Sequence, residues 1–325
     1  MLRVGFIGAG GNAEGHMRRV KEIEDVEIAA ICDVVLERAQ AMARAVGGVA
    51  YDDYREMLDK EALDAIYISI PPFAHGEVDV LAAQKKAALF IEKPVALDME
   101  TGLRIWEAVQ QAGIITCVGY QTRYLDAAQR GREFLADKTI GMVVCNRWGG
   151  IAGGAEHWWR VMEKSGGQLV EQTTHQVDLM RFLVGEIVEV TARYALRVCA
   201  DLENFTIPDA QVLTLQFLSG AIGTLTTSCM MTRGGGKSSL DILLRDLRLE
   251  WTRDGWKTYP EQVPELAAPP QPRPSIDEVF IHAVRTGDAS LIQSDYADAL
   301  RTLDVTLAAN ESARTGQPVR TYFAR

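Results

Sequence analysis

The sequence predicts an α/β protein of two domains, and three observations lead to this class. Over the first 120 residues, short apolar runs alternate with amphipathic helical patterns, as in a doubly wound parallel sheet with helices on both faces. After Tyr120, strand candidates follow one another without helices long enough for crossovers, which favours an antiparallel or mixed sheet. A chain of 325 residues is also too long for one modest core. We expect one domain over residues 1–121 and an α+β domain over residues 122–325.

In both domains, each predicted strand is a short run rich in apolar residues and each predicted helix has one apolar face. In the first domain the strands cover residues 2–7, 26–31, 65–70, 88–91 and 114–118, and the helices cover residues 13–23, 36–46, 54–58, 74–86 and 99–112. In the second domain the strands cover residues 141–147, 189–199, 211–218, 223–230, 239–244 and 248–251, and the helices cover residues 127–136, 168–184, 276–286 and 296–314.

The composition restricts the partners and the compartment. The formal net charge is −10 and the chain has no long run of lysine or arginine, which argues against a nucleic-acid-binding surface. The five cysteines are scattered without a Cys-x-x-Cys pair, so we expect reduced thiols and a cytoplasmic protein. No apolar run approaches the ~20 residues that span a bilayer, and a strand that starts at Leu2 leaves no room for a signal peptide.

A glycine-rich turn lies between the first strand and the first helix. Residues 8–13 read Gly-Ala-Gly-Gly-Asn-Ala and fit the Gly-x-Gly-x-x-Gly/Ala pattern of dinucleotide-binding turns. Gly8 permits the tight turn, Gly10 lets the backbone approach a pyrophosphate, and the small third residue lets helix and strand pack. The N-terminus of the helix, with Gly11 and Asn12, would hold the phosphates. The pattern alone also fits a plain glycine-rich turn, but the flanking strand and helix agree with dinucleotide binding.

Asp33 ends the next apolar run, 25 positions after Gly8. Its carboxylate can accept hydrogen bonds from the adenosine ribose hydroxyls and would repel a 2′-phosphate. Val34 and Val35 follow, so no adjacent arginine would bind that phosphate, although Arg38 lies about one helical turn later. The sequence therefore predicts NAD as the cofactor, with NADP as the less favoured alternative.

Two further strand ends carry candidate residues. Pro71 and Pro72 would stiffen a loop beside the nicotinamide ribose, and His75 either joins this cofactor site or caps the next helix. The triplet 92–94, Glu-Lys-Pro, follows another apolar strand. Ligands bind at the carboxyl ends of the strands in open α/β sheets, so we expect Lys93 to lie beside a nicotinamide ring.

A second motif lies in the predicted helix 168–184. Glu171, His175 and Asp178 occupy positions i, i+4 and i+7, so they share one face, and apolar residues occupy nearly the opposite face. We expect the titratable stripe to look outward. A histidine oriented by a carboxylate suits acid/base chemistry on an alcohol, but the same pattern fits a solvated Glu–His pair worth roughly 0.2–0.5 kcal/mol. A second imidazole ligand is hard to place among five histidines, so we expect no required metal.

Together, the turn at residues 8–13, Asp33, the triplet 92–94 and the helix with Glu171 and His175 resemble the Gfo/Idh/MocA oxidoreductases, the family of glucose–fructose oxidoreductase and inositol dehydrogenase. The resemblance covers nearly the whole chain. It implies an N-terminal Rossmann domain that binds NAD(P) and a C-terminal α+β domain with a large, mostly antiparallel sheet. The open face of that sheet implies a homodimer or homotetramer. Members usually move a hydride between nicotinamide and a secondary hydroxyl of a sugar, cyclitol or related polyol.

The resemblance also implies roles for individual residues. Lys93 would contact the reacting hydroxyl and the nicotinamide ribose, and His175 would be the principal acid/base. Glu92 and Pro94 would position Lys93. The nicotinamide side would be lined by Pro71, Pro72 and Gln121. Many dehydrogenases of the family have an aspartate four residues before the histidine, where this chain has Glu171, so the relay keeps its charge and changes its reach.

Specificity is expected from a loop and an arginine near the start of the second domain. Aromatic faces pack against the C–H faces of sugar rings, and arginines hold hydroxyl or carboxylate oxygens. The expected substrate-binding residues are Arg123, Trp158, Trp159 and Arg160, together with Lys93, Glu171 and His175. A tryptophan that only fills the domain interface is the alternative. Two other functions stay open: an NAD-dependent glycosidase that uses transient oxidation, and a non-catalytic dinucleotide-binding sensor.

Overall fold

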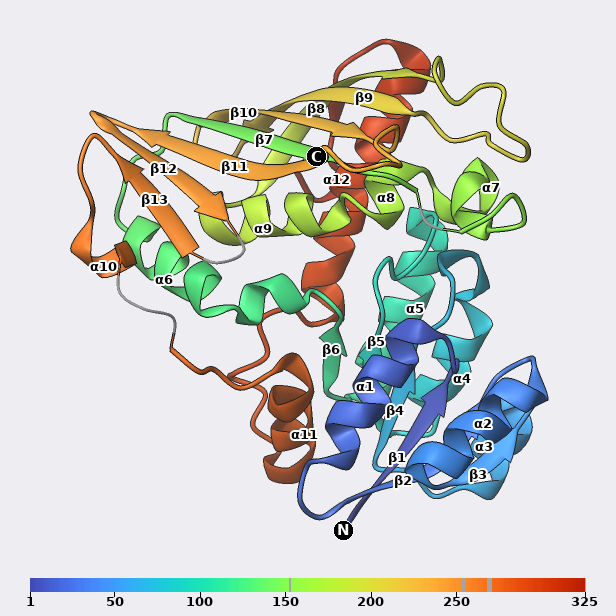
Figure 1. Ribbon diagram of the computed structural model, residues 1–325. Coiled ribbons are helices and arrows are strands. Elements are labelled where there is room, and N and C mark those ends of the chain that lie inside the picture. Colours follow the sequence, from blue (N-terminus) through green and yellow to red (C-terminus); the bar gives the residue numbers. More distant parts are fainter. Residues whose placement is uncertain (152, 253–254, 268–270, 325) are drawn as a thin grey trace. The chain divides into compact units, whose positions relative to one another are not determined.

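The chain folds into two compact units. The computed structural model describes residues 1–151, 153–252, 255–267 and 271–324 (Figure 1). The first unit contains residues 1–121 and 274–300, and the second contains residues 122–273 and 301–325. We expected all of 122–325 to form one domain, so the placement of 274–300 is a difference. Its reason is that the helix within this segment packs against the first helix of the chain.

The first unit is built on a six-stranded parallel sheet with the strand order β3-β2-β1-β4-β5-β6. Its strands are β1 (Leu2–Ile7), β2 (Val26–Cys32), β3 (Val49–Tyr51), β4 (Ala65–Ile68), β5 (Ala88–Ile91) and β6 (Thr116–Val118). Its helices are α1 (Gly11–Lys21), α2 (Leu36–Val46), α3 (Tyr54–Lys60), η1 (Pro72–Ala74), α4 (Glu77–Gln84), α5 (Met99–Ala112) and α11 (Ile276–Thr286). The turn η2 (Gln121–Tyr124) begins at the last residue of the segment 1–121 and continues into the second unit. The predicted doubly wound parallel sheet is confirmed.

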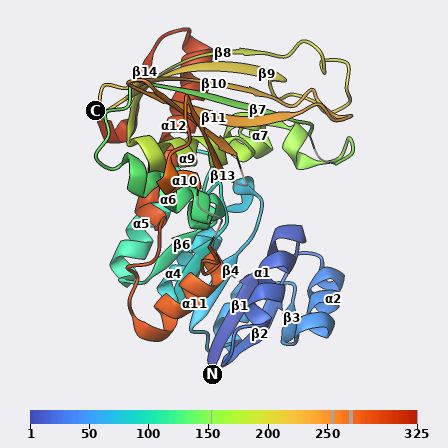
Figure 2. The same ribbon diagram turned by 60° about the vertical axis from the view of Figure 1, so that its left-hand side comes forward.

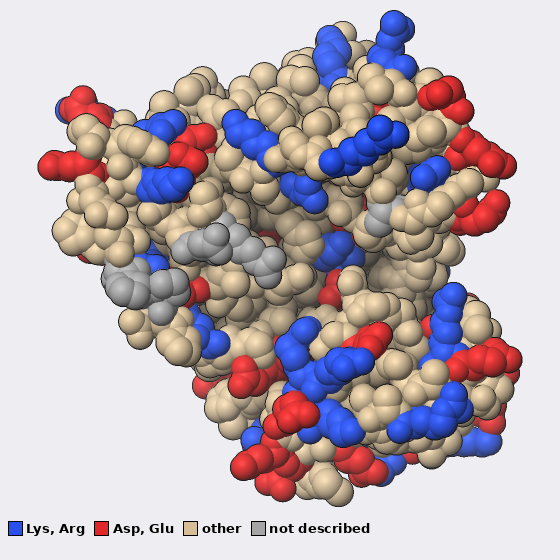
Figure 3. Space-filling view, in the orientation of Figure 1, with Lys and Arg blue, Asp and Glu red and all other residues tan. Residues whose placement is uncertain are grey.

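Local sequence signals set the helix ends in this unit. The Asp98 side chain accepts a hydrogen bond from the Thr101 N–H and starts α5. Ser275 and Glu278 form a reciprocal capping box at the start of α11. On the face shown in Figure 3, basic and acidic side chains are interspersed, as expected for a solvated surface.

The second unit is built on an eight-stranded sheet with the order β13-β12-β11-β7-β10-β9-β8-β14. Its strands are β7 (Met142–Trp148), β8 (Ile187–Ala195), β9 (Ala210–Phe217), β10 (Ile222–Ser228), β11 (Lys237–Leu244), β12 (Leu247–Thr252), β13 (Gly255–Tyr259) and β14 (Val319–Arg320). All neighbours pair antiparallel except β7 and β10, which are parallel. The expected large, mostly antiparallel sheet is confirmed.

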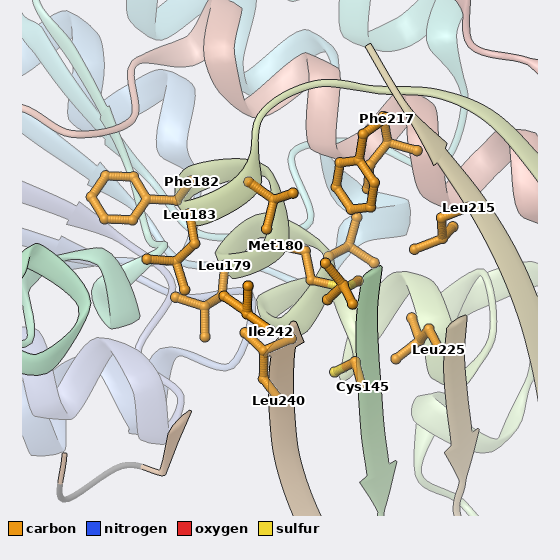
Figure 4. Packing of buried hydrophobic residues seen from close by; sticks show 14 of the residues in the cluster. Cys145, Leu179, Met180, Phe182, Leu183, Leu215, Phe217, Leu225, Leu240 and Ile242 are labelled. Atoms are coloured by element: carbon orange, nitrogen blue, oxygen red, sulfur yellow. The ribbon is translucent and has the colours of Figure 1, made fainter. Parts of the chain in front are cut away.

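One face of this sheet carries the core of the second unit. Its helices are α6 (Asp126–Leu135), η3 (Trp158–Arg160), α7 (Met162–Ser165), α8 (Gln168–Glu171), α9 (Thr174–Val184), α10 (Pro264–Ala267), α12 (Tyr296–Thr315), which continues from the first unit, and η4 (Tyr322–Ala324). Figures 1 and 2 show α6 and α9 along the same face. In Figure 4, Leu179 and Met180 of α9 point toward Cys145, Leu225 and Ile242 from the strands, and all five are at most 1% exposed.

The predicted helix 168–184 is wrong in one respect. The structure has two helices here, because α8 ends at Glu171 and α9 begins at Thr174. The Thr173 N–H bonds back to the carbonyl of Gln168, five residues earlier, instead of continuing the α-helical ladder. Strands β3, β13 and β14 were not predicted.

Within the described residues, no helix combines the length and apolar character needed to cross a membrane.

Candidate active site

The carboxyl ends of five parallel strands carry the candidate cofactor residues of the first unit. Gly8 follows β1, Asp33 follows β2 and Pro71 follows β4 by three residues. Glu92 and Lys93 follow β5, and Gln121 comes shortly after β6. The strand order reverses between β1 and β4, and the carboxyl edge at such a reversal is where open α/β sheets bind ligands. The structure therefore brings these sequence-predicted residues to one edge of one sheet.

The turn after β1 can be made only by glycine at its first position. Gly8 has φ +102°, and a Cβ added there would lie 2.1 Å from the carbonyl oxygen of Ser69. Its N–H donates to the carbonyl of Cys32 at 2.8 Å. At Gly10 and Gly11, an added Cβ would meet no atom within 4 Å, so this side of the turn is open. Helix α1 begins at Gly11 and runs for eleven residues, so its first N–H groups face that open side.

Asp33 is held beside this turn by two backbone donors. The Ala9 N–H donates to Oδ2 at 2.9 Å, and the Val35 N–H donates to Oδ1 at 2.9 Å. The carboxylate is thereby tied to the glycine turn, although 24 residues separate Ala9 from Asp33. Val34 is 90% exposed and offers no positive charge beside it. The arrangement suits a neutral ribose edge and disfavours a phosphate group.

His75 lies immediately before Gly76, the N-cap of α4, and contacts the Asp79 side chain that caps the helix, so it does not cap α4 itself. Its side chain is fully buried, and Nδ1 lies 2.9 Å from Oδ1 of Asp79. The other oxygen of Asp79 accepts the N–H of Gly76 at 2.7 Å, at the start of α4. A buried imidazole presents no surface to a cofactor. A direct cofactor contact through the His75 side chain therefore does not follow from the structure.

Glu92 and Lys93 begin immediately after β5. The Glu92 N–H extends the sheet by donating to Ile68, and the Gly119 N–H donates to Ile91 on the other side. The Glu92 side chain is 5% exposed, whereas Lys93 is half-buried. Oε1 of Glu92 lies 2.9 Å from Nε2 of His16 on α1. Sequence reasoning missed His16, whose only local signal is a place among the buried residues of an amphipathic helix.

In the second unit, the three predicted titratable residues do not form one outward stripe. Glu171 ends α8, whereas His175 and Asp178 lie on α9, so the break separates them. Glu171 is 5% exposed, Asp178 is fully buried, and His175 is half-buried. The expectation that all three face outward is wrong, because Asp178 is needed inside the unit as the partner of an arginine.

That arginine is Arg123. Its Nε and Nη2 donate to the two carboxylate oxygens of Asp178 at 2.8 and 2.6 Å, and Thr302 Oγ1 lies 3.1 Å from the same carboxylate. Arg123 is 4% exposed, and its guanidinium also lies over the ring of Phe182. A bidentate, buried pair of this kind is a structural tie between the start of the unit and α9. Held in this way, Arg123 presents little surface to a substrate, and its expected role in holding substrate stays a prediction.

The tryptophan loop is a compact turn. Nδ1 of His157 lies 3.3 Å from the Trp159 N–H, and the imidazole stacks on Trp158 with ring centroids 5.7 Å apart. Burial, followed by the charge of Arg160, lowers the pKa of His157. Arg160 donates to the carbonyl of Gly153 at 3.1 Å. The three predicted substrate residues at positions 158–160 are each half-buried, so they stay available as a surface of aromatic and cationic groups.

No group of three or more His, Cys, Asp or Glu side chains that could hold a metal is found among the described residues. What the first unit does assemble is a glycine turn at a helix start, an anchored acid on the neighbouring strand and a lysine two strands further along. This fold and site define a dinucleotide-binding oxidoreductase.

Comparison with known proteins makes the assignment specific. Residues 2–120 match a family model described as "Oxidoreductase family, NAD-binding Rossmann fold", and residues 128–250 match the "GFO/IDH/MocA C-terminal domain". The chain belongs to the Gfo/Idh/MocA family.

Individual relatives agree with this family. The myo-inositol 2-dehydrogenase of Thermotoga maritima is 29% identical over 241 residues, which cover 70% of this chain and 68% of that protein. The scyllo-inositol 2-dehydrogenase (NAD(+)) of Bacillus subtilis is 24% identical over 332 residues, with 98% and 96% covered. Among solved structures, the WlbA dehydrogenase from Bordetella pertussis in complex with NADH and UDP-GlcNAcA has a TM-score of 0.84. It is 23% identical, with 98% of each chain covered, and shares the fold.

Proposed function

We propose that this protein is an NAD-dependent dehydrogenase or reductase that moves a hydride between nicotinamide and a secondary hydroxyl of a sugar, cyclitol or related polyol. The observation that carries the proposal is the convergence of the Gly8 turn, Asp33 and Lys93 at the carboxyl edge of one parallel sheet. The family membership supports hydride chemistry, and the inositol dehydrogenases among the relatives support a polyhydroxylated ring as substrate.

The residues present fit the dinucleotide. The turn is open where a pyrophosphate would approach, and the N-terminus of α1 would face it. Asp33 would accept the ribose hydroxyls, and the absence of a basic residue next to it favours NAD over NADP. Pro71, Pro72, Glu92 and Gln121 would border the nicotinamide end. When bound, NAD supplies the hydride acceptor in the oxidative direction.

The chain's own residues would manage the proton and the developing charge. We assign the acceptance of the alcohol proton to the His175 imidazole, with Glu171 as its carboxylate partner in the family pattern. We assign stabilisation of the developing alkoxide to the Lys93 ammonium, because a cation aimed at growing negative charge lowers the barrier. Trp158, Trp159 and Arg160 are assigned to the substrate, the rings against C–H faces and the guanidinium to hydroxyl or carboxylate oxygens.

A substrate panel tests this function. Purified protein is mixed with NAD or NADP and a panel of inositols, aldoses, sugar acids and glycosides, and reduced cofactor is followed by absorbance while products are identified by mass spectrometry. Stoichiometric NADH with a ketone product supports the dehydrogenase. Cleavage of a glycoside without net NADH identifies the glycosidase instead. Tight NAD binding without either reaction across the panel identifies a sensor.

We also propose a homodimer or homotetramer joined through the open face of the eight-stranded sheet. Along β9 and β10 the side chains alternate, with Leu213, Leu215 and Leu225 buried. On the other face, Val212 is 53% exposed and Ile222 is 57% exposed. A β-sheet that carries apolar residues on both faces commonly uses its exposed face as a subunit interface. The occupant is assigned as a second copy because the family pairs through this sheet.

The scattered cysteines, all five buried and unbridged, fit a reducing, cytoplasmic setting.

A further inference from the structure

A buried chain of charged side chains runs through the first unit to the residue beside Lys93. His16 lies on α1 and is 5% exposed. Its Nδ1 is 2.6 Å from Oδ1 of Asp277 on α11, and its Nε2 is 2.9 Å from Oε1 of Glu92. The other oxygen of Asp277 accepts a hydrogen bond from Nε of Arg19. The Arg19 side chain is partly exposed and is the last of these charged groups. The four side chains come from α1, α11 and the end of β5, and 261 positions separate His16 from Asp277.

The geometry fixes the protonation state of His16. Ionised carboxylates only accept hydrogen bonds, so an imidazole held between two of them must donate from both nitrogens and carry a positive charge. Arg19 Nη2 also lies 3.0 Å from Nδ1, but a guanidinium cannot accept, and the shorter contact to Asp277 identifies Nδ1 as a donor. Burial opposes the charge, yet the hydrogen bonds to Asp277 and Glu92 outweigh it and raise the pKa of His16 to about 9.

The other groups around His16 do not supply a competing acceptor. Tyr67 of β4 and Phe90 of β5 pack against the imidazole, with ring centroids 5.6 and 4.7 Å away. Burial, followed by the charge of Asp277, raises the pKa of Tyr67 well above its usual value, so this phenol stays neutral. Phe280 of α11 stands edge-on to Tyr67 and Phe90. Among the described residues, the imidazolium thus packs against the rings of Tyr67 and Phe90, and its nitrogens meet Asp277, Glu92 and Arg19.

Glu92 is clamped on its far side as well. A Cβ added to Gly119 would lie 2.7 to 2.9 Å from the carboxylate atoms of Glu92, so the carboxylate rests directly on the backbone of Gly119. The backbone of the same segment is fixed by the Glu92 N–H bond to Ile68. With His16 on one side and Gly119 on the other, the Glu92 side chain has one place to lie. Its main chain leads directly into Lys93.

We propose that His16 is a positioning residue for Lys93: its charged ring, anchored by Asp277 and Arg19, holds the Glu92 carboxylate against Gly119 and so fixes the backbone from which Lys93 extends. The effect on turnover rests on the proposed function of Lys93. The position of the Lys93 side chain does not depend on that function, and a separate experiment measures it. A merely structural His16 would stabilise the unit without setting the position of this lysine.

The kinetic test compares His16→Gln with Val20→Ala. Val20 is a fully buried residue of the same helix, one turn further from the glycine turn, and its apolar side chain carries no charge and no hydrogen-bonding group. For His16→Gln we expect kcat to fall at least about tenfold while the NAD dissociation constant changes less than about threefold. For Val20→Ala we expect a loss of stability with kcat within about twofold. Equal effects of the two variants on kcat, or a normal kcat in His16→Gln, overturn the proposal.

Two measurements without turnover keep the inference separate from the proposed activity. In ¹⁵N-histidine NMR spectra of the protein without ligand, the resonances absent from His16→Gln should show an imidazolium at pH 8. A neutral ring at this pH overturns the proposal. Reductive methylation with ¹³C-formaldehyde labels lysines, and Lys93→Arg identifies the Lys93 signal. That signal should shift in His16→Gln and stay in place in Val20→Ala; an unchanged signal in both contradicts a positioning role. If no substrate is turned over, these two arms still decide the inference.

Discussion

In the proposed function, the residues at the strand ends have separate roles, because cofactor binding and chemistry are assigned to different side chains. We assign Asp33 and the glycine turn to the adenosine and pyrophosphate portions of the dinucleotide, whereas Lys93 follows β5, two strands from β1 and three from β2. A change at one should therefore leave the other intact. This separation gives the first prediction its form.

Lys93→Ala should lower kcat steeply while leaving NAD binding in place. The ammonium is assigned to charge that develops only in the reaction, so we expect a fall of about 10² to 10⁴ in kcat and less than about threefold change in the NAD dissociation constant. Steady-state kinetics and a fluorescence titration with NADH measure the two quantities. Lys85→Ala, which removes an exposed lysine paired with Asp59, serves as the control. Near-normal turnover in Lys93→Ala contradicts the assignment.

His16 should give the stability of the protein an alkaline dependence. Its pKa is raised from 6.5 to about 9 in the folded state, so its stabilising effect is complete below pH 6.5 and disappears as the pH rises through about 9. The difference in unfolding free energy between wild type and His16→Gln should therefore shrink by up to about 3 kcal/mol between pH 6 and pH 10. Urea unfolding across this range measures it, with Val20→Ala as a pH-independent reference. A constant difference would show that His16 is neutral when folded.

At the scale of elements, the turn between β1 and α1 demands glycine for two different reasons. At Gly8 the backbone and the Ser69 carbonyl exclude a side chain, whereas at Gly10 the conformation is ordinary, with φ −78°, and the space is open. The first glycine serves the fold, and the second leaves room for a ligand.

The free energy of unfolding of the Gly8→Ala variant should therefore be about 2–4 kcal/mol lower than that of the wild type. The new Cβ would displace neighbouring backbone, and alanine would have to adopt a disfavoured φ. Gly10→Ala should change stability by less than about 1 kcal/mol and weaken NADH binding, because its Cβ fills the approach of the pyrophosphate. Urea unfolding and NADH fluorescence titrations of both variants separate the two effects. Unchanged NADH affinity in Gly10→Ala would place the dinucleotide elsewhere.

What could be predicted from the sequence follows from the range of the interactions. Except for β3, the strands of the first unit and the residues at their ends are encoded by apolar periodicity and by turns a few positions long, and both are visible locally. The break between α8 and α9 is not, because Gln172, Thr173 and Thr174 are polar residues that a helix also tolerates. Arg123 illustrates the same limit, since its partner Asp178 lies 55 positions away and decides whether the guanidinium faces substrate or core.

His16 was invisible for the same reason on a longer range. Its partners are 76 and 261 positions away, and no spacing rule connects them. The return of residues 274–300 to the first unit places Asp277 beside α1. Patterns along the sequence group residues 274–300 with the second unit, whose residues precede them. The predicted domain boundary therefore did not return this segment to the first unit.

At the scale of the whole molecule, one face of the eight-stranded sheet carries no helix among the described residues of its unit. Helices α6 and α9 lie on the opposite face (Figure 1). The free face has apolar residues between threonines along β9 and β10. Met142 and Ile222 line a groove there together with Thr214 and Thr224. With buried leucines on one face and exposed valine and isoleucine on the other, this sheet supports the proposed subunit interface on its open face.

Ile222→Glu should separate the subunits of the proposed oligomer without unfolding them. Ile222 is 57% exposed in the single chain, so a glutamate there is solvated in the monomer but buried and unpaired in a dimer that uses this face. We expect the mass from light scattering to fall to that of one chain at micromolar concentration, with little change in the far-ultraviolet circular dichroism. Glu265→Lys changes an exposed charge on α10, which packs against β13 and against α6 on the helix-covered face, and should keep the wild-type mass. A wild-type protein that is already a monomer, or an Ile222→Glu oligomer of unchanged mass, would assign the open face to another partner.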